Sequence, residues 1–157
     1  MRCALLYKGP PRSYNAQSRS RFQDRLRKDS KRLVFPPEPM RSPSLYSKVF
    51  YFHRGKRDID ADNISKPVLD ALRGVAFIDD AQVCWRLSAK VDVSRPYTVR
   101  QNDIAAEAYA ELIESLGDET AMDLLYVEVS HLQVQDVSLG REPEWNVTPR
   151  SPDTSMN

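Results

Sequence analysis

Hydrophobic and polar residues alternate most clearly over residues 83–93. The apolar positions there are Val83, Trp85, Leu87, Ala89, Val91 and Val93. A period of two predicts a long β-strand with one buried face. Residues 45–53 and 124–132 also predict strands, because they are rich in aromatic and β-branched residues and contain neither Gly nor Pro. A short apolar run at 4–7, followed by a Lys-Gly-Pro-Pro turn, predicts an opening strand.

Two segments with helical spacing lie on either side of these central strands. Residues 17–33 predict an amphipathic helix with a narrow apolar stripe of Phe22, Leu26 and Leu33. Residues 104–116 predict a second helix, with Asn102 or Asp103 as its N-cap. Its apolar positions are Ile104, Ala108, Leu112 and Leu116.

A third helix is predicted over residues 63–73. Its buried stripe is Ile64, Val68 and Leu72, at positions i, i+4 and i+8. Asp62 or Asn63 supplies an N-cap, and Gly74 follows the end as a C′ residue. Pro67 is compatible with this helix only in or next to its first turn, because proline lacks a backbone N–H.

The order of these elements predicts a small α/β (α+β) domain, with a mixed sheet of about four strands and helices packed on it. A chain of 157 residues is long enough for one domain. We expect the domain to cover residues 1–133. The prolines of residues 35–44 predict a stiff connector inside it. Residues 134–157 are rich in Pro, Ser and polar residues and predict a disordered tail.

The net charge of +1 hides a strong asymmetry along the chain. Residues 1–57 contain 15 Lys/Arg and 3 Asp/Glu, a balance of +12, and residues 58–157 contain 8 and 19, a balance of −11. The basic segment 12–32 is either a solvated helix face or a surface that contacts the phosphates of a polyanion. On the second interpretation the candidate DNA-binding residues are Lys8, Arg12, Arg19, Arg21, Arg25 and Lys28.

Cysteine content and hydropathy exclude several classes of protein. Two cysteines form no disulfide framework, so a reducing compartment is expected. No run approaches the ~18 apolar residues of a membrane span, and the opening apolar run is too short for a signal peptide.

The acidic stretch 58–82 carries the candidate chemistry. Asp60 and Asp62 alternate, so in extended backbone their carboxylates would point the same way. Asp80 lies just before the strand at 83–93, and we expect it to approach the other two there. Clustered carboxylates are ligands that Mg²⁺ and Mn²⁺ prefer, and Lys66 could offset charge on a phosphate in the transition state. The sequence thus predicts a metal-assisted phosphodiesterase site.

Two other interpretations of this stretch stay open. The acidic residues could be a solvated turn with a capping Asp, and Lys66 with Asp70 could be a surface ion pair. The acidic residues at alternate positions, Asp58, Asp60 and Asp62, also match the opening of a calcium loop. Lys66 at the ninth position and Leu69 at the twelfth argue against that loop, because a bidentate Glu belongs at its end.

Three short motifs here resemble the RusA-type Holliday-junction resolvase family: Asp-Ala-Asp-Asn-Ile-Ser-Lys at 60–66, Asp-Ala-Leu at 70–72 and Asp-Asp-Ala-Gln at 79–82. The resemblance places the family's catalytic residues on Asp60, Asp62, Asp80 and Lys66. Asp79 matches a further acidic position and is a fourth candidate metal ligand. Asp58 is expected to be an acidic neighbour and not a ligand.

The resemblance implies a homodimeric, Mg²⁺-dependent endonuclease that resolves four-way DNA junctions in recombination and repair, with Mn²⁺ as a possible substitute. It further implies a cytoplasmic protein encoded by a bacterium or a bacteriophage. Two rival functions remain: a non-catalytic branched-DNA-binding protein of the same fold, and a calcium-loop interaction module.

Overall fold

The computed structural model describes residues 1–13, 15–118 and 123–133. These residues form five strands, three α-helices and two 3₁₀ turns. In chain order they are β1 (Arg2–Lys8), α1 (Arg19–Asp29), β2 (Lys31–Val34), β3 (Leu45–His53), α2 (Ala61–Leu72), η1 (Asp80–Gln82), β4 (Val83–Asp92), η2 (Gln101–Asp103), α3 (Ala106–Gly117) and β5 (Asp123–His131). The predicted α+β class is confirmed.

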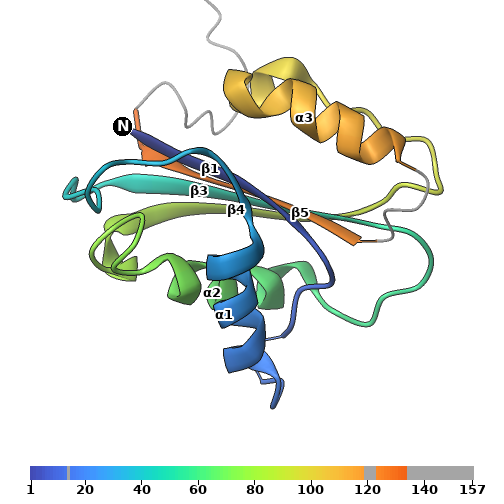
Figure 1. The fold of residues 1–157 in the computed structure, drawn as a ribbon, viewed down its shortest axis with the longest axis horizontal. Coiled ribbons are helices and arrows are strands. Elements are labelled where there is room, and N and C mark those ends of the chain that lie inside the picture. Colours follow the sequence, from blue (N-terminus) through green and yellow to red (C-terminus); the bar gives the residue numbers. More distant parts are fainter. Residues whose placement is uncertain (14, 119–122, 134–157) are drawn as a thin grey trace, which may run out of the picture.

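The strands form one mixed sheet in the order β2-β1-β5-β3-β4. All pairs are antiparallel except β3 with β4, which α2 connects as a parallel crossover. Helices α1 and α2 lie on one face of the sheet and α3 on the other (Figure 1). The last strand, β5, lies between β1 and β3, so the two ends of the described chain meet in the middle of the sheet.

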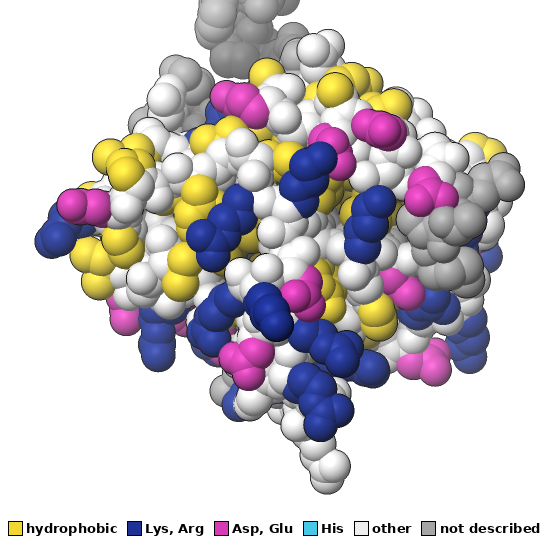
Figure 2. Space-filling model, viewed as in Figure 1, with side chains coloured by type: hydrophobic (Ala, Val, Ile, Leu, Met, Phe, Trp, Pro, Cys, Tyr) yellow, Lys and Arg dark blue, Asp and Glu magenta, His cyan; other side chains and the backbone are white. Residues whose placement is uncertain are grey.

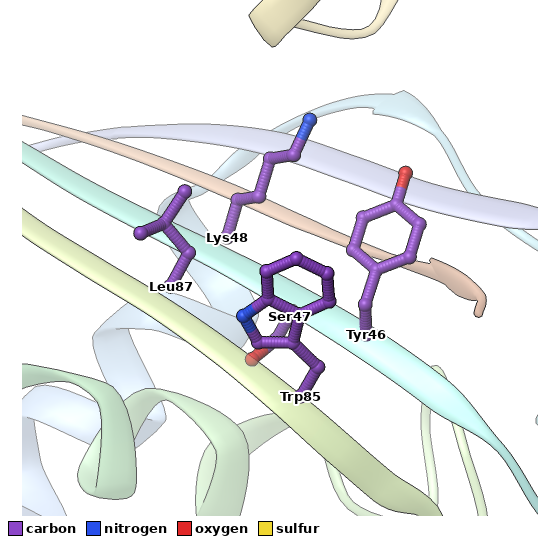
Figure 3. Close-up of a pocket in the computed structure, with 5 residues that line it drawn as sticks. All are labelled: Tyr46, Ser47, Lys48, Trp85 and Leu87. Atoms are coloured by element: carbon purple, nitrogen blue, oxygen red, sulfur yellow. The ribbon is translucent and has the colours of Figure 1, made fainter. Parts of the chain in front are cut away.

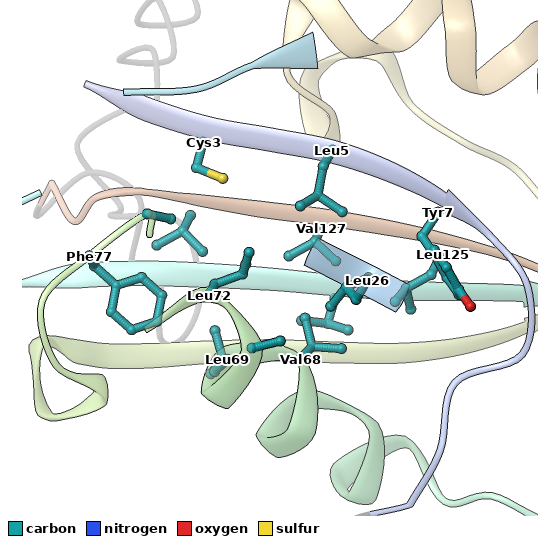
Figure 4. Close-up of a cluster of buried hydrophobic side chains, with 14 of the residues drawn as sticks. Cys3, Leu5, Tyr7, Leu26, Val68, Leu69, Leu72, Phe77, Leu125 and Val127 are labelled. Carbon is teal, nitrogen blue, oxygen red and sulfur yellow. The ribbon is translucent and has the colours of Figure 1, made fainter. Parts of the chain in front are cut away.

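The main core lies between the sheet and the pair α1–α2 (Figure 4). Leu5 of β1 and Val127 of β5 point from the sheet toward Leu26 of α1 and Leu72 of α2. Each of these four side chains is at most 2% exposed. The predicted stripe of Ile64, Val68 and Leu72 is fully part of this core, since residues four apart share one helix face. A second, smaller core lies under α3.

The predicted helix over residues 17–33 is too long at its C-terminal end. α1 ends at Asp29, Ser30 is its C-cap, and residues 31–34 form β2. Leu33 matches helical spacing, but it packs in the second core, on the opposite face from Phe22 and Leu26. The backbone of β1 accepts residues 31–34 as a strand partner. The expected four strands are therefore five.

Helix α2 begins two residues earlier than predicted. Asp60 is its N-cap in extended conformation, and Asp62 lies in the first turn, so neither predicted cap residue is correct. Pro67 lies inside the helix and is buried, where the sequence predicted a place near its start. Gly74 takes a φ of 75° directly after the C-cap, as expected of a glycine at that position.

Strand β4 confirms the predicted alternation but not its full burial. Val83 packs in the main core, so the alternation holds from Trp85 onward, and Val91 packs in the second core, under α3. β4 is an edge strand, and α3 packs over the opposite half of the sheet. Trp85 is partly buried and Leu87 is 45% exposed. Together with Tyr46 and Lys48 of β3 they line a shallow pocket (Figure 3).

Helix α3 also begins later than predicted, because residues 101–103 form a separate 3₁₀ turn. Its N-cap is Ala105, and not Asn102 or Asp103. The Ala105 N–H donates to the buried Glu128 carboxylate at 3.0 Å, and the hydroxyls of Tyr46 and Tyr126 donate to it as well. This network ties the start of α3 to the sheet.

No helix in the described part of the chain has the length and hydropathy needed to cross a bilayer. The predicted tail at 134–157 lies outside the described residues. The connector at 35–44 contains no helix or strand, and Met40, 2% exposed, anchors it through a bridge to Phe77.

Candidate nuclease site

The acidic motif lies along one side of α2 and in the turn that follows it. Asp60 caps the helix, Asp62 lies in its first turn, and both carboxylates are exposed. Lys66 is one turn further and partly buried. Because a helix places residues three and four apart on neighbouring positions, Lys66 lies between the first turn and Asp70.

Lys66 joins α2 to the turn before β4. Its Nζ donates to Asp70 Oδ1 at 3.0 Å and to Asp80 Oδ2 at 3.2 Å. The hydrogen bond with Asp70 raises the pKa of Lys66, and the bond with Asp80 adds to this rise. The same bond from Lys66 lowers the pKa of Asp80, against the smaller opposing effect of its burial. Lys66 is thus the cation that neutralises Asp70 and Asp80.

The turn that carries Asp80 is held by a residue whose role the sequence analysis missed. Gln82 Oε1 accepts from the N–H of Ile78 at 2.9 Å and of Asp79 at 2.8 Å. Gln82 Nε2 donates to the carbonyls of Met40 at 3.1 Å and Ser42 at 2.6 Å. Asp79 completes a capping box by accepting from Ala81 N–H at 2.9 Å. The Gln three residues after Asp79 was the available signal.

The segment that leads into α2 is fixed by polar residues of β4 that the sequence analysis also missed. Ser88 Oγ donates to the Ala61 carbonyl at 2.6 Å. Lys90 Nζ donates to the carbonyls of Arg57 and Ile59, each at 3.0 Å. Ser88 and Lys90 occupy the polar positions of the alternating strand, which face α2. That alternation could have located them, though not their partners.

Asp60, Asp62 and Asp80 do not meet at one point. Among the described residues, no three Asp, Glu, His or Cys side chains gather as a group that could hold a metal ion. The start of α2 lies beside Ser88, in the middle of β4, whereas Asp80 precedes Val83 at its beginning. The expected convergence on a single ion is therefore not met.

The assumption of extended backbone behind that expectation fails. In extended backbone the carboxylates of Asp60 and Asp62 would point the same way. Asp62 instead lies in the first turn of α2, so this relation does not hold. The N–H of Asn63 donates to Asp62 Oδ1 at 3.0 Å. The carboxylates are hard oxygen donors and suit Mg²⁺ in kind. Among the described residues, however, Asp80 does not join Asp60 and Asp62 in one group, and the Lys66 ammonium lies between Asp70 and Asp80.

The same geometry excludes the calcium-loop interpretation. A loop opening at Asp58 would need residues 58–69 to wrap around an ion, but residues 61–72 are helical. Leu69, its twelfth position, is 1% exposed and lies in the main core.

Helix α1 packs directly on α2 and brings basic residues beside the acidic motif. Arg27 Nε donates to the Ala71 carbonyl at 2.7 Å, and Gln23 Nε2 donates to the Pro67 carbonyl at 3.2 Å. Both donors lie on one side of α1, and its core stripe of Phe22 and Leu26 lies next to them. Lys and Arg side chains gather on the surface over α1 (Figure 2).

The structure brings together three of the six candidate DNA-binding residues. Arg12, Arg21 and Arg25 line one pocket with Tyr7 and Phe22. Lys8, Arg19 and Lys28 do not line it. Lys8 is the exposed last residue of β1, and Lys28 is exposed in the last turn of α1.

Comparison with known families agrees with the motif and extends it along the chain. A family model described as Endodeoxyribonuclease RusA matches residues 12–99. That range is 88 of the 157 residues and includes α1, α2, η1 and β4. A search of curated proteins finds no match. The chain therefore belongs to the RusA family of endodeoxyribonucleases.

Proposed function

We propose that this protein is a structure-selective DNA endonuclease that cuts four-way junctions, and that Asp60, Asp62, Lys66 and Asp80 form its catalytic centre. Family membership supports a nuclease. One structural observation carries the proposal further: the basic helix α1 packs on α2, which carries the acidic motif, through Gln23 and Arg27. A polyanion attracted by α1 would therefore lie beside Asp60 and Lys66.

In this proposal Lys66 and Asp80 act as a pair. Lys66 holds its proton because two carboxylates accept from it, so it can meet the negative charge that develops on a phosphate. Asp80 stays ionised because Lys66 lowers its pKa. A phosphate that approaches Lys66 competes with Asp80 for the same ammonium, which leaves Asp80 free to act on the substrate.

The rival function is a protein of the same fold that binds branched DNA without cutting it. Replacing Asp80 by Asn separates the two. We expect Asp80→Asn to reduce cleavage of a labelled four-way junction by about two orders of magnitude, with junction binding unchanged or stronger because one negative charge is gone. Asp58→Asn is the matched control, since Asp58 is an exposed neighbour that pairs with Lys56 at 3.8 Å. Wild-type protein that binds the junction but never cuts it would favour the rival.

Dependence on Mg²⁺, with Mn²⁺ as a substitute, belongs to the same proposal. Its support is the chemistry of two donors, the exposed carboxylates of Asp60 and Asp62 at the start of α2, which are hard oxygen ligands. When bound, the metal would supply charge neutralisation and an activated water. Isothermal titration of Mn²⁺ tests this without any cleavage assay: Asp60→Asn and Asp62→Asn should abolish binding, and Asp58→Asn should not. Equal binding by all three variants would place the ion elsewhere.

The active form is proposed to be a homodimer. Two opposed strands must be cut at a four-way junction, and a two-fold axis would present one catalytic centre to each. The surface around Trp85 and Leu87, which α3 leaves uncovered, is an apolar patch that a second copy could cover.

A further inference from the structure

Three arginines from two separate segments line one pocket, here called the arginine pocket. Arg12 lies in the turn after β1, and Arg21 and Arg25 lie one turn apart on the exposed side of α1. Its floor is Tyr7 and Phe22, which are 5% and 3% exposed. Their rings meet edge to face with centroids 5.8 Å apart. The three arginines therefore share one pocket with a buried aromatic pair.

No acidic side chain lines the arginine pocket. Within the described residues, none of these three arginines forms a salt bridge. Asp29 lies one turn beyond Arg25 on α1, but the two side chains are not paired. Arg27 on the same helix differs, because α2 carbonyls accept from it. Three positive charges that lie close together without a counter-charge repel one another. An anion that binds among them would relieve this repulsion and be attracted by all three arginines.

The first turn of α1 adds to the positive potential. Ser18, the N-cap, also lines the arginine pocket. Its side chain makes no capping hydrogen bond, and the first turn contains no acidic residue. Within the described part of the chain, no acidic residue of the first turn neutralises the positive end of the helix dipole.

A second hollow continues from the arginine pocket toward the candidate catalytic centre. The two share Pro10 and Arg12, and the second extends to Arg57 and Ile59, directly before Asp60. Arg57 is held by Asp123, to which its Nε donates at 2.9 Å. The carboxylate of Asp58 also lines this hollow, at its solvent-exposed side. Arg12 is thus the charged residue common to both hollows.

We propose that the arginine pocket binds one backbone phosphate of the DNA substrate and so directs that strand toward the first turn of α2. A phosphodiester suits this pocket, because its two free oxygens can accept hydrogen bonds from the paired N–H groups of guanidinium side chains. The inference rests on the proposed function and adds a positioning site to it. It assigns this role to Arg12, Arg21 and Arg25, and not to Lys28.

The first test compares single substitutions. Arg12→Gln, Arg21→Gln and Arg25→Gln should each weaken binding of a fluorescent four-way junction about tenfold in metal-free buffer. Lys28→Gln removes the same charge from the exposed side of the same helix and should change affinity less than about twofold. All four side chains are exposed, so melting temperatures should match that of the wild type.

A series of salt concentrations distinguishes one shared phosphate from a diffuse basic surface. Each phosphate contact contributes about 0.9 to the slope of log affinity against log salt. If the arginines share one phosphate, the double variant Arg21→Gln/Arg25→Gln should lose a slope of about 0.9, like either single variant. A loss of about 1.8 would overturn the single-phosphate pocket.

Neutral methylphosphonate linkages locate the phosphate. The neutral linkage is placed at one position of the junction at a time. At one internal position it should weaken wild-type binding about tenfold. The same substitution should not affect binding by Arg25→Gln, because that variant has already lost the contact with this phosphate. If only removal of a 5′-terminal phosphate has this effect, the pocket holds a strand end and the backbone assignment is wrong.

The remaining outcomes separate this inference from the proposed function. If the wild type cuts junctions while the three pocket variants bind like Lys28→Gln, the arginine pocket has no role and only the inference fails. If the wild type neither binds nor cuts branched DNA, the proposed function fails and the inference fails with it.

Discussion

At the scale of single residues, Lys66 decides the charge balance of the candidate centre. It is 41% exposed and its partners Asp70 and Asp80 are about a quarter exposed. Solvent screens such a pair, so it contributes only about 0.5–1 kcal/mol to stability. Its importance lies in keeping Asp80 ionised and in presenting a cation between α2 and η1.

The pH dependence of this contribution follows from the two pKa shifts. The pKa of Asp80 is lowered from 3.8, so its contribution is present above that value and is lost as pH falls through the folded pKa. The pKa of Lys66 is raised from 10.5, so its contribution is present below that value and is lost as pH rises through the folded pKa. The pair therefore stabilises the fold between about pH 4 and pH 10.

We predict that Lys66→Met lowers the free energy of unfolding by about 0.5–1 kcal/mol at pH 7 and has a smaller effect at pH 2.5. Urea denaturation at both pH values measures the difference. Lys56→Met is the control, because the Lys56–Asp58 pair is fully exposed and should not change stability at either pH. A Lys66→Met effect of equal size at both values would mean that lost packing, and not the ion pair, accounts for it.

Among single residues, the sequence motif named Asp60, Lys66 and Asp80 as candidates because composition and spacing are local properties. It includes Gln82 but did not reveal its role, since the Gln82 amide joins two segments about 40 positions apart. Nor did it reveal which of the basic residues converge, since Arg12 comes from a turn and Arg25 from a helix. Such groupings depend on how α1 packs, which no short sequence window contains.

At the scale of elements, η1 is the connection that places Asp80. It is only three residues long and has no buried side chain of its own. Its position comes from Gln82, which accepts from the N–H groups of Ile78 and Asp79 and donates to the carbonyls of Met40 and Ser42 in the 35–44 connector. Gln82 is a positioning residue in this scheme, since it touches the turn and not the substrate.

Gln82→Ala should therefore lower stability by about 1–2 kcal/mol, because partly buried backbone groups lose their partners. It should also reduce junction cleavage at least tenfold while junction affinity changes less than twofold. Gln82→Glu retains the acceptor but loses the Nε2 donors, so it should recover only part of the activity. Gln101→Ala, at an exposed position in η2, is the control for a general effect of losing an amide. Equal loss of binding and cleavage would argue against a positioning role.

Elements with a long regular pattern were predicted closely. The strand over 45–53 is confirmed to the residue, and β4 differs by one residue at its end. Errors arose where a short segment had two possible partners. Residues 31–33 fit a continuing helix, yet β1 offers backbone hydrogen bonds that make them a strand. Helix starts at α2 and α3 were also misplaced, because several Asp and Asn residues compete for each cap.

At the scale of the whole molecule, the uncovered edge of the sheet bears on assembly. β4 is an edge strand whose exposed apolar residues include Leu87, at 45%, next to the partly buried Trp85. A monomer that leaves this patch in water gains nothing from it, whereas a dimer would bury it. Within the described chain, no sixth strand pairs with the outer edge of β4.

We predict that the wild type is a dimer in solution and that Leu87→Glu shifts it toward the monomer, with the fold retained. Light scattering coupled to size-exclusion chromatography measures the mass. Ile113→Glu is the matched control, since Ile113 is similarly exposed, at 42%, but lies on α3. A wild-type monomer, or equal dissociation by both variants, would contradict this assignment of the interface.

The sequence alone determined the class of fold, the main strands, the buried stripe of α2 and the acidic motif, because each is recorded as a local period or spacing. Only the tertiary structure decided that β5 lies between β1 and β3, that Arg12 joins Arg21 and Arg25, and that Asp62 and Asp80 stand at different levels of β4. The physical reason is that these relations arise from packing between distant segments. A carboxylate's neighbours in space are set by how α2 crosses β4, and the spacing of residues along the chain does not contain that information.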